Sequence, residues 1–80
     1  MLDQYIEAAI QRHQCEYLNE DGVFFCNIPE LRGVWADGPT IEACTEELRE
    51  VLFDWIQIRL DRGLAVPVLD GLELTAANVS

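Results

Sequence analysis

The sequence predicts a two-layer α+β domain with its elements in the order α-β-β-β-α-β. Three observations support this fold class: a long amphipathic pattern over residues 40–63, a strand–turn–strand pattern around residues 15–28, and a length of 80 residues, which suits one core. We expect a single domain over residues 1–80. Its sheet would be an antiparallel three-stranded meander with a fourth strand after the long helix, and both helices would cover one face.

The long helix is predicted over residues 40–63. Thr40 is a favourable N-cap because its hydroxyl can accept a hydrogen bond from an unpaired amide of the first turn. Gly63 suits the left-handed position after the last turn, and Pro67 prevents continuation. Apolar residues recur at steps of three and four and form one face: Ile41, Cys44, Leu48, Val51, Leu52, Trp55, Ile58 or Ile56, and Leu60.

A shorter helix is predicted over residues 2–12. Its apolar residues also share one face, and polar residues occupy the other. A helix of this length is marginal in water without packing partners. We therefore expect its apolar face to join the core: Leu2, Tyr5, Ile6, Ala9 and Ile10.

Two strands flank Asp21-Gly22. Residues 13–19 alternate with a period of two, and residues 23–28 are rich in strand-forming side chains. Asp-Gly favours a two-residue type I′ turn, which requires positive φ at both positions. The register that follows pairs Glu20 with Val23, Tyr17 with Cys26, and Cys15 with Ile28.

Pro29 ends the second strand because it cannot donate to a central ladder. Residues 34–36 form a short third strand. After the helix, apolar runs at residues 64–69 and 72–75 both qualify as the last strand, and 72–75 is the better candidate. Residues 76–80 are expected to fray.

The second face of the sheet carries Val23, Phe25 and Leu18. Leaving such side chains in water is unfavourable, since burying one Phe contributes roughly 1.5–3 kcal/mol. We expect this face or an edge strand to mediate self-association into a dimer or tetramer.

The charge balance is strongly acidic, with 15 Asp and Glu against five basic residues, all Arg, for a net charge of −10. Direct binding of nucleic acid is disfavoured because phosphate contacts need Lys and Arg. An acidic surface attracts basic partners, although it also serves solubility alone. On the long helix, carboxylates recur every fourth residue. This pattern is typical of a solvated stripe and equally of a docking face for a basic protein.

No residue pattern indicates catalysis, a cofactor or a metal site. His13 and Cys15 lack a third group to orient them, and the only serine is Ser80. A ribonuclease H-type site would need carboxylates gathered around Mg²⁺, and Glu16, Glu20 and Asp37 form no convincing set. We therefore expect a binding protein, not an enzyme.

The three cysteines, Cys15, Cys26 and Cys44, are odd in number and form no C-x-x-C pair. We expect them to be small buried hydrophobes with reduced thiols. The N-terminus lacks the features of a signal peptide, and no run of about 20 apolar residues is present to span a bilayer. These features predict a cytoplasmic protein without membrane contact.

The middle of the chain resembles the HicB-like antitoxin family, over roughly residues 2–74. The shared pattern is an aromatic strand ending in I-P-E-L-x-G, a short strand, and a Gly-x-Thr entry into an acidic helix. Ala43 and Pro39 depart from it. The residues that carry it are Ile28, Pro29, Glu30, Leu31, Gly33, Gly38, Thr40, Glu42, Glu47, Leu48, Glu50, Leu52, Trp55 and Ile56.

The resemblance implies a partial ribonuclease H-like sheet that self-associates. It also implies binding to a small basic HicA-type toxin that cleaves mRNA. Many family members continue into a DNA-binding domain, so the resemblance is to a short form without it. For toxin contact we predict the exposed acidic stripe of the long helix, Glu46, Glu50 and Asp54.

Overall fold

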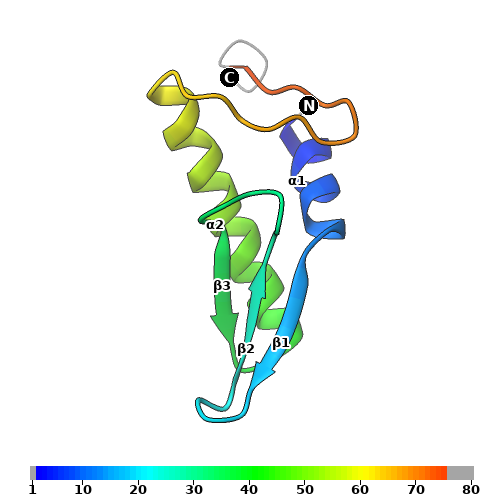
Figure 1. Ribbon diagram of the computed structural model, residues 1–80, viewed down its shortest axis with the longest axis vertical. Helices are drawn as coiled ribbons and strands as arrows, with labels where there is room; N and C mark the ends of the chain where they lie inside the picture. The colour runs from blue at the N-terminus through cyan, green and yellow to red at the C-terminus, as the bar shows by residue number, and fades with distance from the viewer. Residues whose placement is uncertain (1, 76–80) are drawn as a thin grey trace.

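The computed structural model describes residues 2–75 and shows an α+β fold with a three-stranded antiparallel sheet and two helices (Figure 1). The strand order is β1-β2-β3. Met1 and the predicted frayed tail at residues 76–80 lie outside the described residues. The elements are α1 (Leu2–Gln11), β1 (Gln14–Leu18), β2 (Val23–Asn27), β3 (Trp35–Gly38) and α2 (Ile41–Asp61).

The ends of α2 are those that the sequence predicts. The Thr40 hydroxyl oxygen accepts a hydrogen bond from the Ala43 amide at 3.0 Å, and Gly63 follows the helix at φ 69°. Of the two alternatives for the buried face, Ile56 is correct, because Ile58 is half exposed. Ile41 is also exposed, and the fully buried residues of the helix are Cys44, Leu48, Leu52 and Ile56.

The predicted register of β1 and β2 is wrong by two residues. The hairpin loop has four residues instead of two, and Leu18 pairs with Val23. The carbonyl of Leu18 accepts hydrogen bonds from the amides of both Asp21 (3.2 Å) and Gly22 (2.8 Å), and Gly22 has φ 68°. Because the shift is even, each side chain keeps its predicted face.

The new register places Cys15 directly opposite Cys26, with 4.1 Å between their Cα atoms, and a disulfide joins them. The expectation of three reduced thiols is therefore wrong for this pair. Cys44 is a buried free thiol, as predicted. It donates to the carbonyl oxygen of Ala36 at 3.4 Å, and burial raises the pKa of this thiol.

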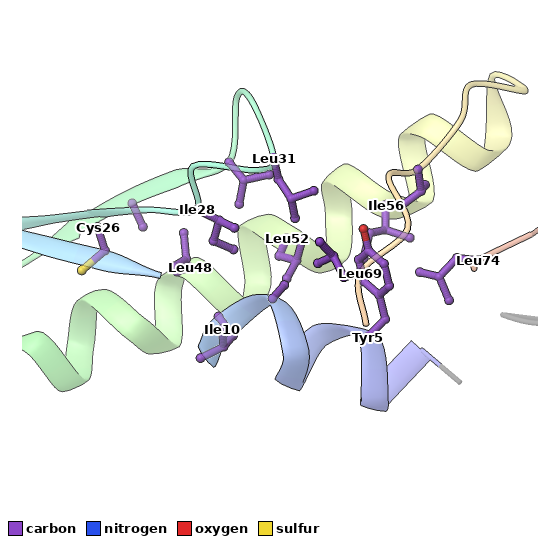
Figure 2. Packing of buried hydrophobic residues seen from close by; sticks show 14 of the residues in the cluster. Tyr5, Ile10, Cys26, Ile28, Leu31, Leu48, Leu52, Ile56, Leu69 and Leu74 are labelled. Atoms are coloured by element: carbon purple, nitrogen blue, oxygen red, sulfur yellow. The ribbon is translucent and has the colours of Figure 1, made fainter. Parts of the chain in front are cut away.

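Helix α1 packs against α2 and not across the sheet, so the prediction that both helices cover one sheet face is wrong. Figure 1 shows α1 beyond the end of the sheet, beside the second half of α2. The 21 residues of α2 extend about 32 Å at 1.5 Å each, whereas five-residue strands span only about 17 Å. Figure 2 shows Tyr5, Leu69 and Leu74 toward the end of the core that contains Ile56, and Cys26 and Ile28 toward the end that contains Leu48.

The predicted fourth strand at residues 72–75 is absent from the described chain. Asp70 (φ 51°) and Gly71 (φ 75°) form a tight turn in which the Leu72 amide donates to the Leu69 carbonyl at 2.7 Å. The segment leaves α2 beyond the sheet and packs on both helices, so it has no strand to pair with. Its buried side chains are Val66, Leu69 and Leu74.

Side chains from the helices fix this C-terminal segment in place. Tyr5 donates its hydroxyl to the carbonyl of Pro67, and the Arg59 side chain donates to the carbonyl of Ala65 at 2.8 Å. Arg12 pairs with Asp70 and, through Nε at 3.0 Å, with Glu30. Arg12 therefore links the end of α1, the β2–β3 connection and the C-terminal segment.

Candidate partner-binding site

An open groove runs between α1 and the second half of α2. Asp3 and Glu7 lie one turn apart on α1, and Glu50 and Asp54 lie one turn apart on α2. The remaining lining residues are Ile6, Arg49 and Phe53. The packing of the two helices therefore places two short rows of carboxylates on opposite sides of an apolar floor. We call this feature the acidic groove.

Most of the negative charge in the acidic groove is uncompensated. Arg49 forms an ion pair with Glu7 across the groove, and this hydrogen bond lowers the pKa of the Glu7 carboxyl and raises that of Arg49. Asp3, Glu50 and Asp54 form no ion pair with any described residue. Arg49 is the only cation among the lining residues in the described part of the chain, so three carboxylates there remain available to a positively charged partner.

The floor of the groove supplies apolar surface. Phe53 is 44% exposed although it is a large hydrophobic side chain, and Ile6 is half buried. An exposed aromatic ring bordered by charged groups is typical of protein interaction sites. The groove can therefore offer a partner both apolar contact and charge complementarity.

The predicted partner-binding residues are only partly brought together. Glu46, Glu50 and Asp54 are all exposed on α2, but only Glu50 and Asp54 line the groove. Glu46 lies one turn earlier. Sequence reasoning missed the α1 side of the site and Phe53. Asp3 and Glu7 lie one turn apart on α1, and this spacing could have indicated its contribution, but only the docking of the helices shows that both residues line the groove.

The other residues considered for chemistry lie apart from this groove. The Nε2 atom of His13 is 3.3 Å from the hydroxyl oxygen of Thr45, so this ring bridges the end of α1 and the first half of α2. Glu16 and Asp37 occupy one row of the outer sheet face, with Phe25 between them. Among residues 2–75, no group of three or more His, Cys, Asp or Glu side chains is arranged to hold a metal ion.

Comparisons with known proteins place the chain in a family. The sequence profile described as UPF0150-like matches residues 4–67. The chain belongs to the UPF0150-like family. A search of curated proteins finds no match. Among solved structures, this UPF0150-like chain is similar to TTHA0281 from Thermus thermophilus, with 33% identity and a TM-score of 0.84. The similarity covers 91% of this chain and 90% of that chain.

The family match includes both walls of the acidic groove, because all lining residues except Asp3 fall within residues 4–67. The similarity to the Thermus structure extends over most of this UPF0150-like fold. Within the described part of the chain, neither helix has the length and apolar character needed to cross a bilayer.

Proposed function

We propose that this UPF0150-like chain is a HicB-like antitoxin module. It binds a small basic HicA-type toxin, which cleaves mRNA, and neutralises it by covering the toxin's RNA-binding face. The observation that carries the proposal is the acidic groove, in which three carboxylates without an ion pair to any described residue lie beside the exposed ring of Phe53. The HicB-like motif order supports the same assignment, and the proposal gives no residue a catalytic, cofactor or metal role.

Charge complementarity supplies the physical reason. A surface that binds RNA must be cationic, and the net charge of −10 on this chain attracts such a surface over long range. The apolar floor then provides short-range contact that a purely electrostatic encounter lacks. On the same resemblance we regard the three-stranded sheet as a partial ribonuclease H-like sheet. We also propose, separately from the resemblance, that the protein is cytoplasmic.

The test is whether a small basic protein is encoded beside this gene and whether it binds this chain. Titration calorimetry should show a complex that weakens as salt rises, and the complex should protect mRNA from cleavage by the toxin. Glu50→Lys should weaken binding roughly tenfold or more and flatten the salt dependence. Asp61→Lys is the matched control, because it makes the same charge change at an exposed site outside the groove.

Two results would contradict the proposal. If no adjacent basic protein binds, the antitoxin function is wrong. If binding occurs but Glu50→Lys and Asp61→Lys weaken it equally, the toxin sits elsewhere on the chain. Glu46→Lys then shows whether the contact extends along α2 beyond the groove.

We also propose that the chain self-associates as a dimer or tetramer. Phe25 and Trp35 stack on the outer sheet face with ring centroids 5.8 Å apart, and Trp35 remains 54% exposed. An oligomeric structural or regulatory domain without a toxin partner is the alternative function that this surface favours. Light scattering that finds an oligomer, together with no binding to the adjacent basic protein, would select this alternative.

A further inference from the structure

The backbone of β3 is open along one side. The Ile28 amide donates to the Val34 carbonyl at 3.4 Å, just beyond the paired strands. Hydrogen-bonded and non-hydrogen-bonded pairs alternate along an antiparallel ladder. Trp35 and Asp37 therefore stand at positions whose N–H and C=O groups point away from β2, toward the free edge of the sheet.

Two further contacts agree with this alternation. The thiol of Cys44 reaches the carbonyl oxygens of Phe24 (3.6 Å) and Ala36 (3.4 Å), which places both carbonyls between β2 and β3. The 4.1 Å separation of the Cys15 and Cys26 Cα atoms is that of a non-hydrogen-bonded pair, so the backbone groups of Cys26 face β3. Both observations fix the phase of the ladder independently of the Ile28 contact.

The space beside this edge is hollow and partly apolar. Between β3 and α2 lies a depression lined by Gly33, Trp35, Ala36, Asp37, Glu47 and Val51. Trp55 adjoins it, since its Nε1 atom would lie 3.7 Å from a Cβ placed on Gly33. Two features limit strand pairing at this edge, the charge of Asp37 and the short length of β3, but the strand contains no Lys, bulge or proline.

We propose that β3 pairs antiparallel with β3 of a second copy, about a twofold axis at Ala36. Trp35 of each copy then lies opposite Asp37 of the other, and the outward N–H and C=O groups of the two residues form four hydrogen bonds. The two sheets join into one of six strands. The inference rests on the proposed self-association and specifies which surface carries it.

The side chains of β3 suit a copy of itself. The residues that face α2 are Ala36 and Gly38, which are small enough for a second strand to approach over Val51. On the outer face, Trp35 extends the stack that it forms with Phe25. The unfavourable contribution is charge, because each copy carries −10. The dimer should therefore tighten as salt screens this repulsion, the opposite of toxin binding.

The experiment uses the full chain in solution. Light scattering measures the dimer constant between about 50 mM and about 0.5 M salt, and amide hydrogen exchange reports Trp35 and Asp37. Asp37→Pro removes an outward donor from each copy without removing a β2–β3 hydrogen bond, and should raise the dimer dissociation constant at least roughly tenfold. Asp37→Asn keeps the donor and removes the charge, so it should tighten the dimer. Circular dichroism checks that both variants fold.

The outcomes separate this inference from the proposals on which it rests. Concentration-dependent protection of the Trp35 and Asp37 amides, lost in folded Asp37→Pro, supports the β3 interface. A dimer that persists in Asp37→Pro, or that leaves these two amides unprotected, overturns the interface but not self-association. A monomer at all salt concentrations overturns both and leaves the acidic groove unaffected.

Discussion

Tyr5 on α1 donates a hydrogen bond to the backbone carbonyl of Pro67, which lies 62 residues later in the chain. The Tyr5 side chain is fully buried, and burial raises the pKa of its hydroxyl to about 12 from 10.0. The folded state therefore favours the protonated form. Stability that depends on this proton is fully present below pH 10 and is lost as pH rises through 12.

The burial of the Tyr5 hydroxyl predicts an alkaline loss of stability that Tyr5→Phe reduces. The free energy of unfolding of the natural chain should fall by about 2–3 kcal/mol between pH 10 and 12 from this group. Tyr5→Phe should lose about 0.5–1.5 kcal/mol at neutral pH, since one hydrogen bond is gone, and show a smaller alkaline decrease. Urea unfolding at several pH values measures both. An unchanged alkaline decrease in Tyr5→Phe, with Tyr17→Phe as the exposed control, would contradict the assignment.

The disulfide predicts sensitivity to dithiol reductants. Cys15 and Cys26 are 11 residues apart. Closing a loop of this size lowers the conformational entropy of the unfolded chain, which raises the free energy of unfolding by about 2–3 kcal/mol. A dithiol reductant should lower the free energy of unfolding by this amount. The double variant Cys15→Ser/Cys26→Ser should be equally unstable with and without reductant. Alkylation that labels all three cysteines of the unreduced, unfolded chain would show that the bond does not form.

The close approach of β3 to α2 at Gly38 predicts that a larger residue at this position destabilises the fold. A Cβ at this position would lie 3.0 Å from the Cys44 amide nitrogen and 3.2 Å from its Cα atom. Both atoms belong to the backbone of the first turn of α2, so neither can rotate away. Gly38→Ala should cost about 1–3 kcal/mol by thermal or urea unfolding. A change within about 0.5 kcal/mol would mean that α2 shifts freely over the sheet.

Replacement of Arg49 by a neutral residue is predicted to strengthen the binding of a cationic partner to the acidic groove. Among the described residues its guanidinium is the only cation lining the acidic groove, and it pairs with Glu7. Arg49→Gln should tighten binding of a cationic protein severalfold and change stability little, because exposed ion pairs contribute little. Arg62→Gln makes the same charge change at an exposed site beyond the groove. Equal effects of the two variants in calorimetric titrations would show that net charge alone governs binding.

Local signals in the sequence predicted the parts of the fold that depend on local chemistry. The cap at Thr40, the left-handed Gly63 and the apolar face of α2 each depend on residues within a turn or two of one another. The hairpin register was missed because the Leu18 carbonyl accepts two amides of a longer loop, and Asp-Gly alone does not distinguish the two loop lengths. The missed register also concealed the Cys15–Cys26 pair.

Long-range placement could not be predicted from the same signals. Periodicity shows that α1 has an apolar face but not what that face contacts. The sequence pattern identified Glu50 and Asp54 as exposed, whereas their assembly with Asp3 and Glu7 depends on α1 packing beside the second half of α2. The absence of a strand at residues 72–75 has the same origin, because the length of α2 takes the chain past the sheet.

Because α2 extends beyond the sheet, it also determines where a label attached to this domain would lie. The start of α1 and the segment that follows α2 lie at the same end of the molecule, opposite the β1–β2 loop (Figure 1). A label attached near the start of α1 or near residue 75 would therefore lie at that end and leave the hairpin tip accessible. A label intended for the opposite end of the molecule must instead be inserted in the β1–β2 loop, at residues 19–22.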